Sequence, residues 1–114
     1  GVMTAPGAHE FFMESAEDAP RWQNRVSVES LETGMYYDPT EYIELIAPTP
    51  LLMIIAGDDV VTPTAVQKRA FERAREPKSL IVVPGQHFDP YVGPLHLQYV
   101  TPEVEWFERH LMPN

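Results

Sequence analysis

Two acidic residues and one histidine stand just after apolar runs of the chain, where their side chains could transfer protons. Asp58 and Asp59 follow the run "LLMIIAG" (residues 51–57), and His87 follows "SLIVVPG" (residues 79–85). A carboxylate beside an imidazole fixes the tautomer of the ring and stabilises the imidazolium that forms when the ring accepts a proton. A histidine held in this way can activate a hydroxyl or a water molecule as a general base. The residue types therefore predict an acid–histidine pair, provided that the fold brings the two segments together.

The same apolar runs predict the strands that must position this pair. Residues 50–56 and 79–84 do not alternate apolar with polar side chains, which is typical of strands covered on both faces of a parallel sheet. Between them, Thr62-Pro63 predicts the N-cap and first turn of a helix over residues 63–76. A strand, a helix and a second strand form a βαβ unit with parallel strands. The fold class predicted from the sequence is therefore α/β.

The order of these elements predicts where the acid and the histidine lie. In a parallel sheet, the loops that follow the two strands leave the same edge, which is where α/β folds hold their ligands. We therefore expect a carboxylate oxygen of Asp59 to lie within hydrogen-bond distance of an imidazole nitrogen of His87. Asp58 is expected to point elsewhere and to cap the helix.

Helices are predicted before and after the βαβ unit in the sequence. Residues 9–22 indicate a short helix, and Asp38-Pro39 predicts the start of another. Between these two, three apolar residues share one helical face: Val28, Leu31 and Met35. A last helix over residues 101–111 is expected to turn three apolar residues inward: Val104, Phe107 and Leu111. We interpret residues 1–48 as a helical cap or linker segment and residues 49–114 as the part that contains the sheet.

Composition excludes several classes of function. Asp and Glu number 17 against 8 Lys and Arg, giving a net charge of −9 that would repel a phosphate backbone, so nucleic-acid binding is not expected. No apolar run approaches the roughly 20 residues that span a bilayer, and the first residues do not resemble a signal peptide. The chain has no cysteine, which excludes disulfides, thiolate zinc ligands and a cysteine nucleophile within it. These features fit a cytoplasmic protein that does not contact membranes.

The stretch "PTPLLMIIAGDDVVTPT", followed by "SLIVVPGQHFDPY", resembles the last third of an α/β-hydrolase. More closely, it resembles the dienelactone-hydrolase and X-Pro-peptidase-like branch. In that family the catalytic acid stands in an Asp-x-x-x-Pro context, matched here by Asp59 and Pro63. The histidine stands in a Gly-x-His context, matched by Gly85 and His87. The resemblance covers about residues 21–112 and implies a C-terminal βαβα part of an α/β-hydrolase core, from residue 49 onward.

The resemblance also implies a Ser-His-Asp triad of which this chain supplies two members. The order Ser…Asp…His is that of the α/β-hydrolases, whose nucleophile lies in a Gly-x-Ser-x-Gly turn. No such motif occurs here, and none of the serines follows a strand-to-helix turn. We therefore expect a C-terminal fragment of a serine hydrolase that acts on an ester, thioester, lactone or amide bond. The substrate would be a small acyl compound, and no cofactor is expected.

Other interpretations of the same residues stay open at this point. An aspartate after a strand often serves only in a turn, and a histidine after Pro-Gly often lies in a solvated loop. His87, Asp89 and Asp59 together could bind a metal ion, although no metal is expected. The pair Asp58-Asp59 is also typical of a phospho-acceptor pocket, but the chain is too short for a receiver domain.

A second hypothesis is that the chain is a non-catalytic structural or oligomerisation fragment. Two strands alone are marginally stable in water, and each has an unpaired edge that invites another strand. We therefore expect the chain to pair with a missing N-terminal half or with a second copy of itself.

Overall fold

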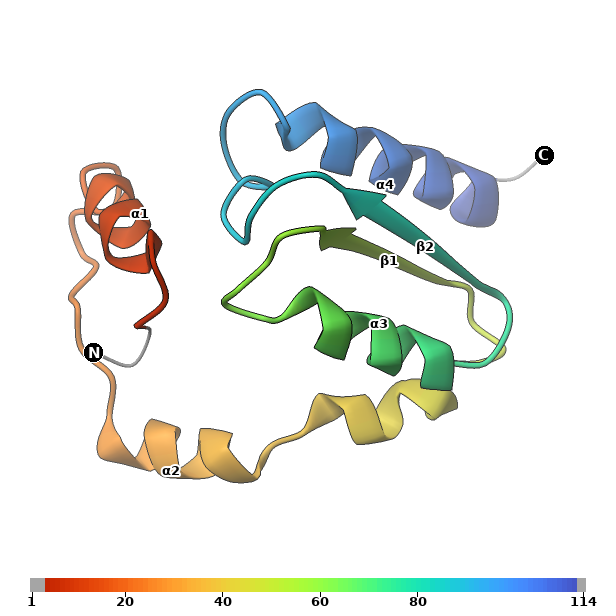
Figure 1. Ribbon diagram of the computed structural model, residues 1–114, viewed down its shortest axis with the longest axis horizontal. Coiled ribbons are helices and arrows are strands. Elements are labelled where there is room, and N and C mark those ends of the chain that lie inside the picture. Colours follow the sequence, from red (N-terminus) through yellow and green to blue (C-terminus); the bar gives the residue numbers. More distant parts are fainter. Residues whose placement is uncertain (1–3, 113–114) are drawn as a thin grey trace. The chain divides into compact units, whose positions relative to one another are not determined.

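The computed structural model describes residues 4–112 and divides the chain into two compact units, Gly1–Pro39 and Thr40–Asn114 (Figure 1). The boundary lies at the start of a short 3-10 helix, η1 (Pro39–Leu45). The interpretation of residues 1–48 as a helical cap or linker segment stays a prediction. In the part of the chain that is described, no helix combines the length and the apolar character needed to cross a membrane.

The first unit contains two short helices, α1 (Ala8–Ser15) and α2 (Val28–Tyr36). Ser27 caps α2, because its hydroxyl oxygen accepts a hydrogen bond from the backbone N–H of Ser30 at 3.1 Å. The predicted helical face is present, but Val28 and Met35 are 79% and 81% exposed. The apolar face of α2 is therefore not buried within this unit.

The second unit contains the predicted βαβ arrangement followed by a long helix. Its elements after η1 are β1 (Leu51–Ala56), α3 (Thr64–Arg73), β2 (Lys78–Val83) and α4 (His96–Leu111). The two strands are parallel and in register from Leu51 opposite Lys78 to Ala56 opposite Val83. This arrangement confirms the α/β fold class and both predicted strands.

Helices α3 and α4 cover opposite faces of the sheet (Figure 1). On one face, Lys78 donates a hydrogen bond from Nζ to the carbonyl of Phe71 in α3 at 2.8 Å, and its ammonium lies 4.6 Å from the centre of the Phe71 ring. On the other face, Trp106 of α4 lines a pocket between this helix and the sheet together with Leu52 and Ile81. Alternate residues of each strand point to opposite faces, so the unbroken apolar runs place apolar residues against a helix on each face.

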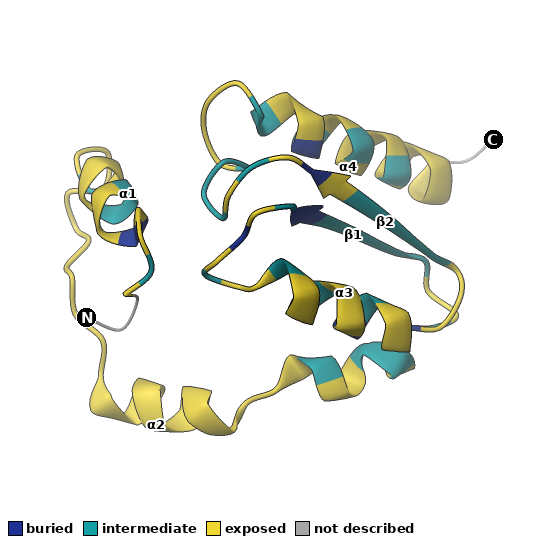
Figure 2. Ribbon diagram, viewed as in Figure 1, coloured by how far each residue is buried: buried dark blue, intermediate teal, exposed yellow. Residues whose placement is uncertain are grey.

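The core lies at the carboxyl ends of the strands (Figure 2). The most buried strand residues are Ile55, Ala56 and Val83. Ala70 of α3, Ala74 just after that helix and Tyr99 of α4 are also buried. The best-packed part of the unit is therefore next to the loops that carry Asp59 and His87, and this packing limits their movement.

Two helices differ from the sequence prediction. The helix predicted over residues 63–76 is α3, which begins at Thr64 and ends at Arg73. The last helix begins at His96, five residues before the predicted start, and Pro102 lies inside it. The pair Thr101-Pro102 predicts the wrong start for this helix, because the sequence does not distinguish a proline in the first turn from a proline farther inside a helix.

The predicted inner face of α4 is wrong for this unit. Val104, Phe107 and Leu111 are 49%, 59% and 72% exposed. Tyr99 is buried instead, and Trp106 lies over the sheet. These two residues lie seven positions apart, two helical turns, and therefore share a face. Helix α4 consequently has a second apolar face that the described residues leave uncovered.

Candidate active site

Asp59 lies in the loop that links β1 to α3, and the start of the helix fixes its position. Its Oδ1 accepts hydrogen bonds from the backbone N–H groups of Val61 at 2.9 Å and Thr62 at 2.8 Å. Its own N–H donates to Oγ1 of Thr64 at 3.2 Å. The Thr64 hydroxyl in turn donates to the carbonyl of Ala56 at 2.7 Å. One carboxylate oxygen of Asp59 thus has the expected turn role, while the other is left for a different partner.

Asp59 and His87 lie together at the predicted edge of the sheet. Nδ1 of His87 is 2.9 Å from Oδ2 of Asp59, although 28 positions separate the two residues. The Asp59 side chain is 5% exposed and that of His87 is 23% exposed. This contact confirms the predicted geometry. The catalytic role of the pair stays a prediction.

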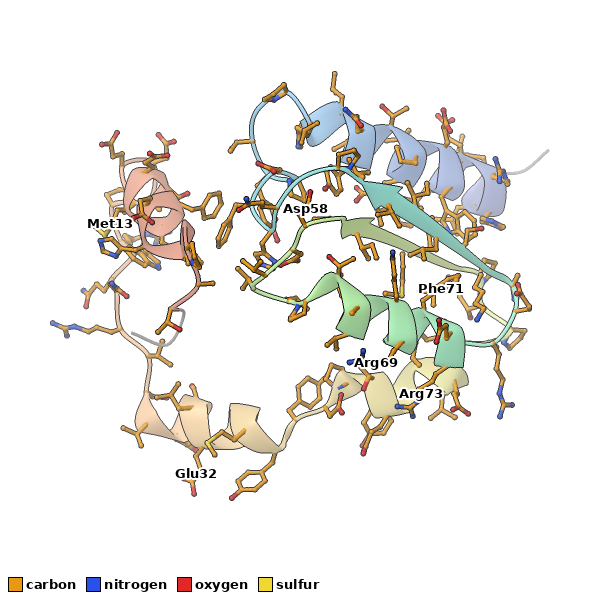
Figure 3. All side chains as sticks on the ribbon, viewed as in Figure 1. Met13, Glu32, Asp58, Arg69, Phe71 and Arg73 are labelled. Atoms are coloured by element: carbon orange, nitrogen blue, oxygen red, sulfur yellow. The ribbon has the colours of Figure 1, made fainter. Side chains whose placement is uncertain are left out.

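Asp58 has a different environment from its neighbour. It is exposed, and it lies on the loop that leaves β1 (Figure 3). Its backbone N–H donates to the carbonyl of Gly85 at 2.9 Å, which ties this loop to the one that carries His87. The two loops are therefore joined through the backbone as well as through the side chains of Asp59 and His87.

Gln67 of α3 is a site residue that the sequence interpretation missed. Its Nε2 donates to Oδ2 of Asp59 at 3.2 Å and to the carbonyl of Thr62 at 2.6 Å. The oxygen that faces His87 therefore has two side-chain partners. Nothing in the sequence marks this glutamine as a site residue, because it belongs to no motif.

The pKa of the Asp59 carboxyl lies below its ordinary value of 3.8. Burial alone would raise this pKa, but hydrogen bonds from His87, Thr62 and Val61 and the charge of His87 lower it. Asp59 is therefore a carboxylate at neutral pH, and it can orient the imidazole and stabilise its protonated form.

The imidazole of His87 uses one nitrogen for Asp59 and leaves the other for chemistry. The ring of Phe88 packs edge-on against it, with ring centres 4.9 Å apart. Among residues 4–112, Nε2 of His87 has no hydrogen-bond partner. A ring held at Nδ1, with Nε2 available, is the arrangement that general-base chemistry needs.

Tyr99, in the first turn of α4, has a buried hydroxyl on which the charges of two carboxylates act, those of Asp89 and Asp59. Burial raises its pKa above the ordinary value of 10.0, and the charges of Asp89 and Asp59 raise it further. Within the described residues, this buried hydroxyl has no hydrogen-bond partner. Tyr99 therefore contributes a neutral, protonated phenol beside two acids.

The serines of the chain do not form a nucleophile turn. Ser79 is the second residue of β2, at the opposite end of the strand from His87. Ser15 donates to the carbonyl of Phe11 at 2.8 Å, and Ser27 and Ser30 bond to each other at 2.8 Å at the start of α2. These hydroxyls form hydrogen bonds at the ends of helices.

In the described part of the chain, no group of three or more His, Asp or Glu side chains is arranged to hold a metal ion. The set Asp59, His87 and Asp89 is therefore not such a group.

Comparisons with known proteins agree with this architecture. No family model matches the chain. It is 36% identical over 90 residues to a polyketide transferase from Gibberella fujikuroi, covering 78% of this chain and 28% of that protein. It is 32% identical over 76 residues to a thiohydrolase from Eupenicillium brefeldianum, covering 66% of this chain and 25% of that protein. The crystal structure of the α/β hydrolase GrgF from Penicillium sp. sh18 superposes with a TM-score of 0.73 at 27% identity, covering 90% of this chain and 36% of that one.

The chain has the fold of the C-terminal part of an α/β-hydrolase, as the resemblance implies. It spans only about a quarter to a third of the length of the curated relatives that it matches. The narrower resemblance to the dienelactone-hydrolase and X-Pro-peptidase-like branch stays a prediction.

Proposed function

We propose that the protein carrying this chain is a serine hydrolase, in which Asp59 and His87 are the acid and the histidine of a Ser-His-Asp triad. The observation that carries the proposal is the 2.9 Å contact between Oδ2 of Asp59 and Nδ1 of His87. The burial of that carboxylate and its lowered pKa support the same roles. The nucleophilic serine would come from residues outside this chain.

In this mechanism the serine oxygen attacks the carbonyl carbon of the substrate while Nε2 of His87 takes its proton. Asp59 stabilises the imidazolium through Nδ1. The bond to the leaving group then breaks, and His87 returns the proton to that group. The resulting acyl-enzyme is attacked by water or another nucleophile, from which His87 takes a proton. The bond between the acyl group and the serine oxygen then breaks, and His87 returns the proton to that oxygen. The serine supplies the covalent bond in these steps, and Asp59 and His87 supply proton transfer and hydrogen bonding.

We propose an acyl substrate with an ester, thioester, lactone or amide bond. Among these, the names of the relatives favour a thioester, since one is called a thiohydrolase. Another is called a polyketide transferase, which is chemically consistent with an acyl-enzyme that passes its acyl group to an acceptor other than water. A cytoplasmic location, which the absence of cysteine fits, is part of the same proposal.

The proposal is tested by turnover and by covalent labelling of the protein that carries this chain. We expect a thioester and a p-nitrophenyl ester to be cleaved, and a fluorophosphonate to label one serine, with both activities lost in His87→Ala. Glu108→Ala, an exposed change on α4 outside both pockets, is the matched control and should behave like wild type. Unchanged labelling and turnover in His87→Ala would refute the triad.

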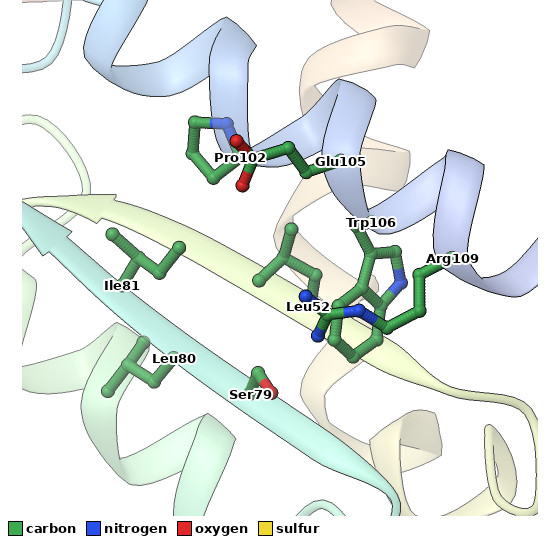
Figure 4. Close-up of a pocket in the computed structure, with 8 residues that line it drawn as sticks. All are labelled: Leu52, Ser79, Leu80, Ile81, Pro102, Glu105, Trp106 and Arg109. Atoms are coloured by element: carbon green, nitrogen blue, oxygen red, sulfur yellow. The ribbon is translucent and has the colours of Figure 1, made fainter.

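A second candidate function is structural, and a specific observation favours it. Between α4 and the sheet lies a pocket of about 290 Å³ at the amino ends of the strands (Figure 4). A second pocket of about 320 Å³ opens beside it, lined by Leu51, Ile54 and Phe107 among others. Both lie at the opposite end of the strands from Asp59 and His87, and both expose apolar side chains. We propose that a missing N-terminal half of the core, or a second copy of this chain, covers these surfaces.

A further inference from the structure

A second carboxylate, that of Asp89, lies in the loop that carries His87, and the proposed reaction does not use it. Its Oδ2 accepts a hydrogen bond from the backbone N–H of Gln86 at 2.6 Å. Its own N–H donates to the carbonyl of Gln86 at 3.2 Å. These two bonds close a turn from Gln86 to Asp89 with His87 inside it. The turn fixes the backbone from which the imidazole extends.

Gly85 allows the carboxylate to lie this close to the chain. Its φ of +126° is one that residues with a side chain rarely adopt. A Cβ at this position would lie 2.6 Å from Oδ2 of Asp89 and 2.8 Å from Cδ1 of Leu95. The Asp89 side chain therefore packs directly on the backbone just before His87.

The same glycine connects the turn to the loop that carries the acid. Its carbonyl accepts the backbone N–H of Asp58 at 2.9 Å. The position of the turn is thereby fixed relative to Asp59, the residue after Asp58. The charges of Asp89 and Asp59 both raise the pKa of the buried Tyr99 hydroxyl.

We propose that Asp89 is a positioning residue, whose carboxylate oxygen holds the turn that directs Nδ1 of His87 to Asp59. The inference rests on the proposed function of the Asp59–His87 pair. Asp89 acts through the backbone of Gln86 and has no part in the proton transfer itself. What the turn requires is a hydrogen-bond acceptor at the position of Oδ2.

Activity measurements on the protein that carries this chain separate the acceptor from the charge. With a p-nitrophenyl ester, Asp89→Ala should reduce kcat by about 10²-fold with little change in KM, because the histidine is misplaced while the substrate surface is unchanged. Asp89→Asn keeps an oxygen acceptor and should retain most of the activity. Gln86→Ala, which removes an exposed side chain but keeps the N–H donor, is the control and should match wild type. An Asp89→Asn variant as impaired as Asp89→Ala would overturn the proposal.

Nuclear magnetic resonance of the His87 ring tests the same inference without any substrate. In wild type and Asp89→Asn, the proton on Nδ1 should give a slowly exchanging signal, because it is held by Asp59. In Asp89→Ala this signal should be lost. A persistent signal in Asp89→Ala would overturn the positioning role. If no variant and no wild-type protein hydrolyses any ester, the proposed function fails, while the ring signal still decides the role of Asp89.

A third substitution decides the question if Asp89→Ala does not fold. Asp89→Glu keeps the charge, but its carboxylate lies one methylene farther from the backbone and cannot close the same turn. We expect Asp89→Glu to lose the Nδ1 signal and Asp89→Asn to keep it. The reverse order would show that charge, and not the short acceptor, holds His87, and the proposal would be wrong.

Discussion

Oδ2 of Asp59 and Nδ1 of His87 lie 2.9 Å apart because the register of two parallel strands continues into the loops that follow them. The last paired residues of the strands are Ala56 and Val83. Beyond them, the N–H of Gly57 donates to the carbonyl of Val83 at 2.8 Å, and that of Asp58 to the carbonyl of Gly85 at 2.9 Å. These bonds hold the loops side by side, so the approach of the acid to the histidine is a direct consequence of the sheet topology.

The lowered pKa of Asp59 predicts a loss of stability in acid. Because the folded-state pKa lies below the ordinary value of 3.8, the carboxylate contributes stability that is fully present above that value. The contribution is lost as the pH falls through the folded-state pKa. Asp59→Asn removes this dependence, so the difference in unfolding free energy between wild type and variant should narrow below about pH 4. Urea unfolding at several pH values measures it, with Asp58→Asn as control, and a constant difference would contradict the prediction.

Tyr99 predicts the opposite behaviour in alkali. Its pKa is raised above 10.0, so the folded state keeps the phenolic proton at pH values where the unfolded chain loses it. Stability from this group is fully present below pH 10.0 and is lost as the pH rises through the folded-state pKa. We expect Tyr99→Phe to be less sensitive to alkali than wild type. Unfolding curves above that pH compare the two proteins, and equal sensitivity would show that the hydroxyl ionises freely.

The same substitution should cost little at neutral pH. The buried Tyr99 hydroxyl has no partner among the described residues, so its removal relieves a desolvation penalty while the ring is retained. We expect the unfolding free energy of Tyr99→Phe to lie within about 1 kcal/mol of wild type. Tyr99→Ala, which also removes the ring, should cost about 3–5 kcal/mol. A loss in Tyr99→Phe as large as in Tyr99→Ala would reveal a hydrogen bond made to residues outside the described range.

The 114-residue chain by itself should not hydrolyse esters. It contains no Gly-x-Ser-x-Gly motif, and the nucleophile and the oxyanion hole each supply a large share of the rate. We expect its rate with p-nitrophenyl esters to equal that of the His87→Ala chain. A wild-type rate clearly above that control would mean that the nucleophile lies within these residues.

The uncovered apolar surfaces predict that the chain does not stay a lone monomer. Phe107 of α4 is 59% exposed and lines one of two open pockets, and Val82 of β2, outside both pockets, is 44% exposed. Soluble monomers rarely leave large apolar surfaces uncovered. Sedimentation at micromolar concentration should therefore show a dimer or a complex with the rest of the core. A compact 13.0 kDa species that melts cooperatively would contradict the prediction.

The sheet and the acid–histidine pair could be predicted from sequence because each rests on a strong local signal. Two unbroken apolar runs define the strands, and parallel topology leaves one edge where the following loops can meet. The start of α4 at His96 could not be predicted, because Thr101-Pro102 imitates a helix start. Its buried face also depends on what covers the other side, which the pattern of Val104, Phe107 and Leu111 does not reveal. The contacts of Gln67 with Asp59 and of Asp89 with Gln86 could not be predicted, because they depend on folded geometry that no motif encodes.

The most direct test of the proposed triad compares Asp59→Asn with Asp58→Asn in the protein that carries this chain. Oδ1 of Asp59 accepts two backbone N–H groups, so the carbonyl oxygen of an asparagine would take that place and its amide would face His87. The amide donates to Nδ1 and holds the imidazole in the wrong tautomer for a general base. We predict a loss of kcat on the order of 10⁴-fold for Asp59→Asn. Asp58→Asn, whose side chain is exposed, should stay near wild type. Equal effects of the two substitutions, or full activity of Asp59→Asn, would contradict the assignment of Asp59 as the catalytic acid.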